Sequence, residues 1–83
     1  MYTLVKFGAP WCAPCKQLDT LLDTMVLDIP IVKVDVEEDT DTAMKFGIRQ
    51  IPTIALVRDG VAISTICKPS KQQIIDLISA EVS

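Results

Sequence analysis

Hydrophobic and polar positions along the chain follow two different periods, and each period predicts its own kind of element. Short runs of apolar and β-branched residues predict buried strands. Apolar positions that recur every three or four residues predict helices with one buried face. The predicted strands cover residues 2–8, 31–36, 53–58 and 61–67, and the predicted helices cover residues 13–26, about 40–46 and a last segment that opens at Ser70.

Individual residues indicate the helix borders, the turns and the buried faces. In the first helix, Asp19 and Asp23 fall opposite an apolar stripe, so we expect both to face solvent. The stripe comprises Cys15, Leu18, Leu21, Leu22, Met25 and Val26. Asp59-Gly60 predicts a hairpin turn, and Gly47 predicts a helix C-terminus. Ser70 to Gln73 forms a capping box, and the buried face of the helix that it opens is predicted to comprise Ile74, Ile75, Leu77 and Ile78.

The order of these elements is β-α-β-α-β-β-α, which predicts an α/β domain with a four-stranded mixed sheet and helices on both faces. The 83 residues are expected to form a single domain, 1–83, because so short a chain supports only one core. The strand over 31–36 is expected at the sheet edge, where Lys33 and the acidic segment that follows would discourage pairing with other chains.

Two cysteines two residues apart, Cys12 and Cys15, stand where a strand passes into a helix. A cysteine at the first turn of a helix meets unpaired backbone N–H groups and the positive end of the helix dipole, and both favour the thiolate. Pro14 suits this turn because its missing N–H costs nothing there. The pair is therefore predicted to be a redox site with Cys12 as nucleophile and Cys15 one turn deeper. The alternatives are two buried structural residues or half of a metal site.

Composition excludes several functions. The net charge of −3 and the scattered basic residues argue against a nucleic-acid partner, and no apolar run is long enough to cross a membrane. The N-terminus lacks the pattern of a signal peptide, which favours the cytoplasm, where thiols stay reduced. The chain has no His for catalysis or a mixed zinc site, and no nucleotide-binding fingerprint. No metal or other cofactor is expected.

Together, three blocks resemble the thioredoxin family over nearly the whole length of the chain. They are Trp11-Cys12-Ala13-Pro14-Cys15-Lys16, Phe46-Gly47-Ile48-Arg49 before Ile51-Pro52-Thr53, and Asp59-Gly60. The resemblance implies a thioredoxin-like fold that lacks the N-terminal strand and helix of full-length thioredoxins and is nearer in size to a glutaredoxin.

The resemblance also implies a function, which is the reduction of protein disulfides in electron transport and cell redox homeostasis. Cys12 would attack a disulfide of a partner protein, Cys15 would resolve the mixed disulfide, and a flavoprotein thioredoxin reductase would reduce the protein again. The resemblance implies a cis bond between Ile51 and Pro52. The surface that binds substrate proteins is expected to comprise Trp11, Ala13, Pro14, Ile51, Pro52, Thr53 and Cys67. The protein is expected to be a monomer.

The chain departs from the family pattern at Lys6 and at Cys67. Lys6 stands where thioredoxins carry a buried aspartate, and Lys33 stands in the place of the lysine that pairs with it. We expect two buried like charges to be costly, so at least one reaches solvent or loses its proton. The hypothesis is that Lys6 and Lys33, with Lys16 beside Cys15, favour the thiolates and raise the reduction potential. Cys67 is either a third reactive thiol or a small apolar filler at a strand end.

Three other functions remain open. A glutaredoxin-like enzyme would take electrons from glutathione, whose carboxylates could meet Lys16, Arg49 and Lys68. A non-enzymatic binding subunit would use the surface at Trp11 and Pro52 without turnover. A metal site would need sulfur ligands shared between two chains.

Overall fold

The computed structural model describes residues 1–82 of the chain, and Ser83 lies outside the described residues. The elements follow the predicted order. They are β1 (Tyr2–Gly8), α1 (Ala13–Thr24), β2 (Ile31–Asp35), α2 (Thr40–Lys45), β3 (Thr53–Arg58), β4 (Val61–Cys67) and α3 (Lys71–Val82). The predicted architecture, a four-stranded mixed sheet with three helices, is confirmed. The predicted borders differ by one or two residues, because β2, α2 and α1 each end earlier than their apolar patterns do.

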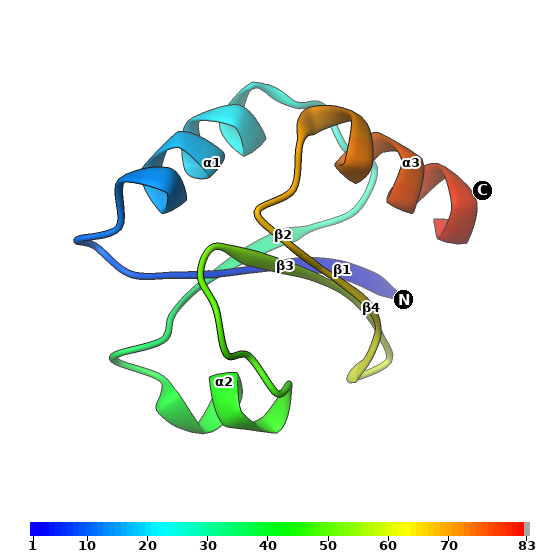
Figure 1. Cartoon of the computed structure of the whole chain (residues 1–83). Coiled ribbons are helices and arrows are strands. Elements are labelled where there is room, and N and C mark those ends of the chain that lie inside the picture. Colours follow the sequence, from blue (N-terminus) through cyan, green and yellow to red (C-terminus); the bar gives the residue numbers. More distant parts are fainter. Residues whose placement is uncertain (83) are drawn as a thin grey trace.

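The sheet has the strand order β2-β1-β3-β4. The first two strands of the chain run parallel, whereas β1 with β3 and β3 with β4 are antiparallel. The predicted edge position of β2 is therefore confirmed. Figure 1 shows α1 and α3 on one face of this sheet and α2 on the other. The N-terminus of α1 lies beyond the end of β1, so the loop between them stands at one edge of the molecule.

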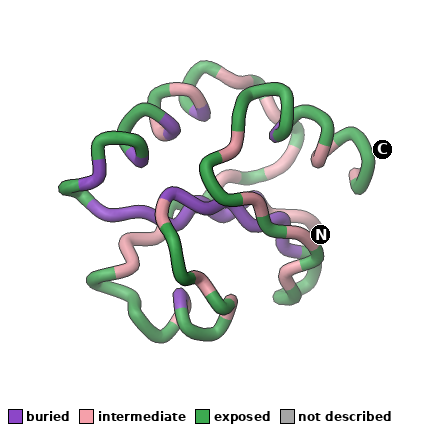
Figure 2. The backbone as a smooth tube through the Cα atoms, viewed as in Figure 1, coloured by how far each residue is buried: buried purple, intermediate pink, exposed green. Residues whose placement is uncertain are grey.

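The two faces of the sheet bury two separate apolar clusters. The cluster between the sheet and the two helices α1 and α3 comprises Leu4, Leu18, Leu22, Ile54 and Ile74. On the α2 face lie Val5, Phe7, Ala43, Ala55 and Val57. In Figure 2 the buried residues concentrate in the central strands and on the inner side of α1. Strands β1 and β3 are covered on both faces, which is why their sequences are continuously apolar instead of alternating.

Local hydrogen bonds define the helix ends. The capping box of α3 is formed as predicted, since the Ser70 hydroxyl accepts from the Gln73 backbone N–H and the Gln73 side chain accepts from the Ser70 N–H. At the end of α2, Gly47 has a φ of +67°, a left-handed conformation that glycine adopts without strain. The N-terminus of α2 is capped by Asp39.

Three predicted burial assignments are wrong. Val26 was expected in the buried stripe of the first helix but is 97% exposed, because α1 ends before it at Thr24. Ile75 is exposed, because α3 packs through Ile74 and the residues three and four positions later. Asp19 was expected to face solvent but is half-buried, with only 32% of its side chain exposed.

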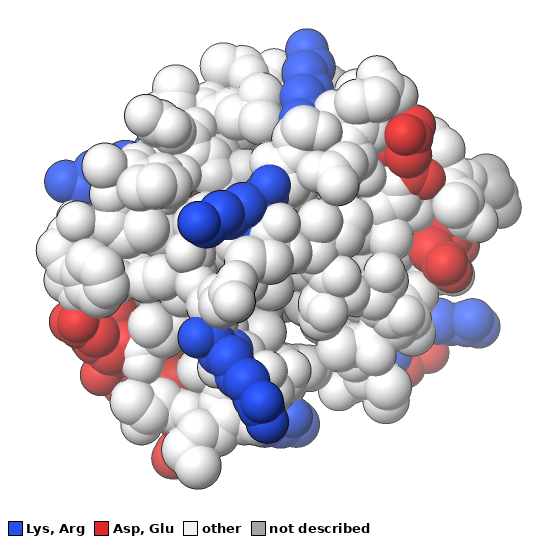
Figure 3. All heavy atoms as spheres, viewed as in Figure 1, with Lys and Arg blue, Asp and Glu red and all other residues white. Residues whose placement is uncertain are grey.

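Basic side chains are scattered among uncharged and acidic ones on the face shown in Figure 3, and they do not form a stripe there. Among residues 1–82, no helix is both long enough and apolar enough to span a membrane.

Candidate active site

A disulfide joins Cys12 and Cys15 where β1 passes into α1, and their Cα atoms are 5.2 Å apart. Both cysteines are buried, but Cys12 is 7% exposed and Cys15 only 1%. They pack with Ala9 and with the partly buried Ile51 in a small cluster of their own. The sulfur that sequence analysis assigned as the nucleophile is thus the one nearer to solvent.

Cys12 is the N-cap residue of α1. Its extended backbone leads the chain into the helix, and its sulfur accepts a hydrogen bond from the backbone N–H of Cys15 at 3.3 Å. Pro14 occupies the first turn, where a missing N–H leaves nothing unpaired. A negative charge on Cys12 would therefore meet the unpaired N–H groups and the positive end of the helix dipole.

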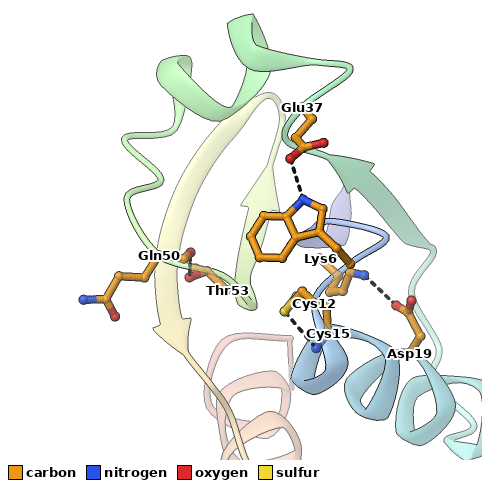
Figure 4. Close-up of a disulfide and its surroundings, with 8 residues drawn as sticks. Lys6, Cys12, Cys15, Asp19, Glu37, Gln50 and Thr53 are labelled. Atoms are coloured by element: carbon orange, nitrogen blue, oxygen red, sulfur yellow. Dashed lines mark hydrogen bonds and ion pairs between the residues drawn. A yellow bond between two sulfur atoms is a disulfide. The ribbon is translucent and has the colours of Figure 1, made fainter.

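Trp11 stands beside the disulfide with 67% of its surface exposed. Its indole Nε1 donates a hydrogen bond to Glu37, a residue of the segment after β2, and this bond is drawn in Figure 4. The bond fixes the orientation of an otherwise exposed ring. Trp11 is therefore an exposed ring and not a core aromatic, and its role as a contact platform stays a prediction.

The loop before β3 approaches the disulfide from the other side. The Ile51–Pro52 bond is cis, the conformation that the resemblance implied. The Pro52 carbonyl accepts a hydrogen bond from the Lys68 N–H at 2.9 Å, which ties this loop to the end of β4. Thr53 is buried to 6% exposure and its hydroxyl donates to the Gln50 carbonyl. It lines a hollow with Gln50 and Cys67, and its part in substrate binding stays a prediction.

A shallow hollow of about 300 Å³ lies between this loop and α1. It is lined by Pro14, Gln17, Leu18, Leu21, Pro52, Lys68 and Pro69. Most of these side chains are apolar, so the hollow suits an uncharged segment of a partner protein. Of the predicted surface residues, Pro14 and Pro52 line it.

Beneath the disulfide, Lys6 is buried to 5% exposure in the central strand β1. Its Nζ lies 2.7 Å from Oδ1 of Asp19 in α1, as Figure 4 shows. The expectation that at least one of the two lysines reaches solvent is confirmed by Lys33, and the carboxylate of Asp19, which was not predicted, faces the buried Lys6. Lys33 points outward with 41% of its side chain exposed, 3.0 Å from Asp23 and 4.0 Å from Asp19. The hydrogen bond from Lys33 to Asp23 raises the pKa of Lys33 above its ordinary value of 10.5.

Cys67 is the third cysteine and is exposed at the end of β4. Its sulfur donates a hydrogen bond of 2.9 Å to the Gln50 side chain, and it pairs with Thr53 across the sheet. Cys67 therefore lies at a strand end, as in the alternative of a small apolar filler, but it is exposed and hydrogen-bonded instead of filling an apolar space. Its role as a third reactive thiol stays a prediction.

Among residues 1–82, no group of three or more His, Cys, Asp or Glu side chains is placed to hold a metal ion. Lys16, which was predicted to influence the sulfurs, is exposed on α1. The candidates for redox chemistry among residues 1–82 are therefore the Cys12–Cys15 pair and the free thiol of Cys67.

Three residues that contact this site, Asp19, Glu37 and Gln50, were not predicted from the sequence. Asp19 follows Cys15 by four positions, a spacing that puts both on one side of a helix and was a usable signal. Glu37 and Gln50 lie far from their partners along the chain, and nothing in the local sequence indicates those contacts.

Comparison with known proteins places this site in a family. The family model "Thioredoxin" matches residues 1–80. Thioredoxin of Pseudomonas aeruginosa is 34% identical over 84 residues, which cover 95% of this chain and 78% of that protein. Thioredoxin of Bacillus subtilis is 39% identical over 66 residues, covering 75% of this chain and 64% of that protein, so the match spans less than two thirds of the relative.

A solved structure supports the same assignment. A point mutant of thioredoxin from Halobacterium salinarum superposes with a TM-score of 0.91 at 29% identity, covering 99% of this chain and 75% of that one. The match includes the strand, the helix with the cysteine pair and the loop with the cis-proline. The chain therefore belongs to the thioredoxin family.

Proposed function

We propose that the protein is a thiol–disulfide oxidoreductase that reduces disulfides in other proteins through Cys12 and Cys15. The observation that carries the proposal is the disulfide at the N-terminus of α1, with the more exposed sulfur at the N-cap position. Membership of the thioredoxin family supports the same activity.

The reaction proceeds in two exchanges. The Cys12 thiolate attacks one sulfur of the partner's disulfide, and the other partner sulfur leaves as a thiolate and takes a proton. Cys15 then loses its proton and attacks the Cys12 sulfur, which breaks the mixed disulfide and releases the second partner thiolate. Two electrons pass to the partner, and the Cys12–Cys15 disulfide remains.

Partner proteins would bind over Trp11, the loop at Ile51 and Pro52, and the hollow beside Pro14. The exposed indole and the apolar lining of that hollow support this surface. Ala13 is exposed between the two cysteines. Cys67 is the last residue of β4, and the next residue, Lys68, donates its backbone N–H to the Pro52 carbonyl. The substrate class is a segment of a protein around its disulfide.

The reductant of the oxidised protein would be a thioredoxin-reductase-type flavoprotein, with glutathione as the alternative. Lys16, Arg49 and Lys68, the candidate contacts for the carboxylates of glutathione, border three different hollows. A tripeptide seated in any one of these hollows would meet only one of the three cations. This favours the reductase.

The same proposal includes a single-domain monomer that works in the cytoplasm. A protein that donates electrons to disulfides needs a compartment whose thiol pool keeps it reduced. Size-exclusion chromatography with light scattering checks the monomer.

A turnover assay tests the proposal. The protein is given a disulfide-linked substrate such as insulin and either NADPH with a bacterial thioredoxin reductase or glutathione with glutathione reductase. We expect NADPH consumption with the first system and loss of turnover in Cys12→Ser and Cys15→Ser variants. Turnover with the glutathione system alone would support the glutaredoxin-like alternative. Turnover with neither would refute the proposed activity and favour a binding subunit. A Cys67→Ser variant measures the part that Cys67 plays in substrate binding.

A further inference from the structure

The buried lysine beneath the disulfide is the feature that the reaction above does not use. Lys6 has only 6% of its side chain exposed and stands in the central strand, where a charged residue is costly unless it is paired. Its ammonium contacts Asp19 at 2.7 Å. Asp19 Oδ1 is itself buried and has no hydrogen bond of good geometry among the described residues, so the contact is mainly one of charge.

Gly8 brings this ammonium close to the sulfur of Cys15. A Cβ placed on Gly8 would lie 2.8 Å from Lys6 Nζ and 3.1 Å from both Cβ and Sγ of Cys15. The ammonium and the sulfur therefore border the same small space, which only a residue without a side chain leaves open. In Figure 4 the labelled Lys6 side chain lies beside the cysteine pair and reaches toward Asp19.

Other charges face the same space from each neighbouring element. An open cleft of about 400 Å³ is lined by Lys6 and by four other charged residues. Two of them, Lys16 and Asp19, belong to α1, and the other two, Lys33 and Asp35, belong to β2. Asp23 holds the Lys33 ammonium at 3.0 Å, outside the cleft lining. Within the described residues, the cation that shares the Gly8 space with Cys15 is that of Lys6.

We propose that Lys6, paired with Asp19 and seated in the space at Gly8, stabilises the thiolate of Cys15. Asp19 and Gly8 are positioning residues, since one balances the charge of the ammonium and the other leaves room for it. This inference rests on the proposed function, because it concerns the second exchange of that reaction. It adds to the sequence-based hypothesis a compensating carboxylate, which comes from α1.

The step that this arrangement assists is the attack of Cys15 on the mixed disulfide. The thiol proton of Cys15 passes to solvent, the thiolate forms a bond to the Cys12 sulfur, and the bond from Cys12 to the partner breaks. The partner sulfur leaves with the electron pair and takes up a proton from solvent. A positive charge beside Cys15 lowers the energy of the thiolate.

The test measures the thiolate directly and does not depend on turnover. In a Cys12→Ser, Cys67→Ser background, Cys15 is the only thiol, and ultraviolet absorbance follows its ionisation with pH. We expect the Lys6→Met change to lower the acid dissociation constant of Cys15 about tenfold or more, the size that one nearby charge produces. In the intact pair, a tenfold smaller equilibrium constant for reduction corresponds to a potential lower by about 30 mV.

A charge exchange separates this role from a merely structural one. A Lys6→Asp, Asp19→Lys double variant restores an ion pair but places the carboxylate beside Cys15. We expect it to unfold at a higher urea concentration than either single change, yet to give a smaller dissociation constant than Lys6→Met does. A double variant that recovers both stability and the parent dissociation constant would overturn the proposal.

Gly8→Ala covers the case in which the lysine variants fail to fold, because it displaces the ammonium and removes no charge. We expect a smaller dissociation constant for Cys15 in this variant. Gly47→Ala is a control for glycine substitution away from the cleft: an added Cβ meets no atom within 4 Å, and the φ of +67° makes this variant the more strained of the two in its backbone. Equal constants in parent, Gly8→Ala and Gly47→Ala would overturn the inference. Absence of turnover in the parent protein, by contrast, would count against the proposed function alone.

Discussion

The sheet carries two lysines side by side, one beneath the disulfide and one at the sheet edge, and they have different environments. Lys6 in β1 pairs in register with Lys33 in β2, and both ammonium groups reach carboxylates of α1. Yet Lys6 is 6% exposed and Lys33 is 41% exposed. The same side chain therefore forms a buried ion pair at one position and a solvated one at the next.

The difference follows from the position of each strand in the sheet. Strand β1 is central and covered on both faces, whereas β2 has a neighbour on one side only. Water screens the pair at the edge, so it contributes little to stability. The pair in the centre has weaker screening, and each partner depends on the other to stay buried. Four predictions test this contrast.

The largest effect is expected from removing the carboxylate that faces the buried lysine. Asp19→Asn leaves the Lys6 ammonium buried without a counter-charge, at an expected cost of about 3 kcal/mol in the free energy of unfolding. Asp23→Asn is the matched change at the edge and should cost less than about 1 kcal/mol. Urea unfolding followed by circular dichroism measures both. Equal losses would show that the two pairs do not differ.

Removing the cation should cost less than removing the anion. Lys6→Met leaves Asp19 partly exposed and able to take water from the open cleft, so we expect a loss of about 1 to 2 kcal/mol. Lys33→Met should change stability by no more than about 0.5 kcal/mol. The same urea titrations apply. A Lys6→Met variant less stable than Asp19→Asn would reverse the predicted order.

A smaller effect is expected at Gly8. A methyl group there crowds the ammonium and the Cys15 side chain, and such overpacking typically costs about 1 kcal/mol or more. Combining Gly8→Ala with Lys6→Met should relieve part of that cost, because the crowded ammonium is gone. A double-mutant cycle measures the coupling. Strict additivity would mean that Gly8 does not seat the lysine.

The smallest effect concerns alkaline pH at the sheet edge. The hydrogen bond to Asp23 raises the pKa of Lys33, so folding is favoured while the ammonium is charged. This contribution is fully present below about pH 10.5 and is lost as the pH rises through the higher folded-state pKa. We expect Asp23→Asn to abolish this part of the alkaline loss, which stays below about 1 kcal/mol because the pair is exposed. Unfolding midpoints measured from pH 8 to above pH 11 would show it, and identical curves would argue against the bond.

Elements with strong local patterns were predictable from the sequence. The apolar runs at 53–58 and 61–67 are the observed strands, and the Ser70 capping box opens the observed helix. The position of Cys12 at the start of α1 also follows from local spacing. Periodicity and capping act over a few residues, so the sequence contains them directly.

Burial near helix ends was less predictable. The apolar pattern of the first helix continues through Val26, although the helix ends at Thr24 and the Val26 side chain is exposed. Ile75 is as apolar as Ile74 but faces away from the sheet. A pattern shows that a residue is apolar, whereas only packing against the sheet decides which apolar residues are covered.

The order of elements, the cysteine pair at a strand-to-helix junction and the lysine in a buried strand all follow from the amino-acid sequence alone. Which charge compensates that lysine depends on how the elements pack together. Lys6 and Asp19 lie in different elements, and their distance depends on how α1 packs on the sheet and on the space that Gly8 leaves. Electrostatic energy depends on distance and burial in space, which spacing along the chain does not specify.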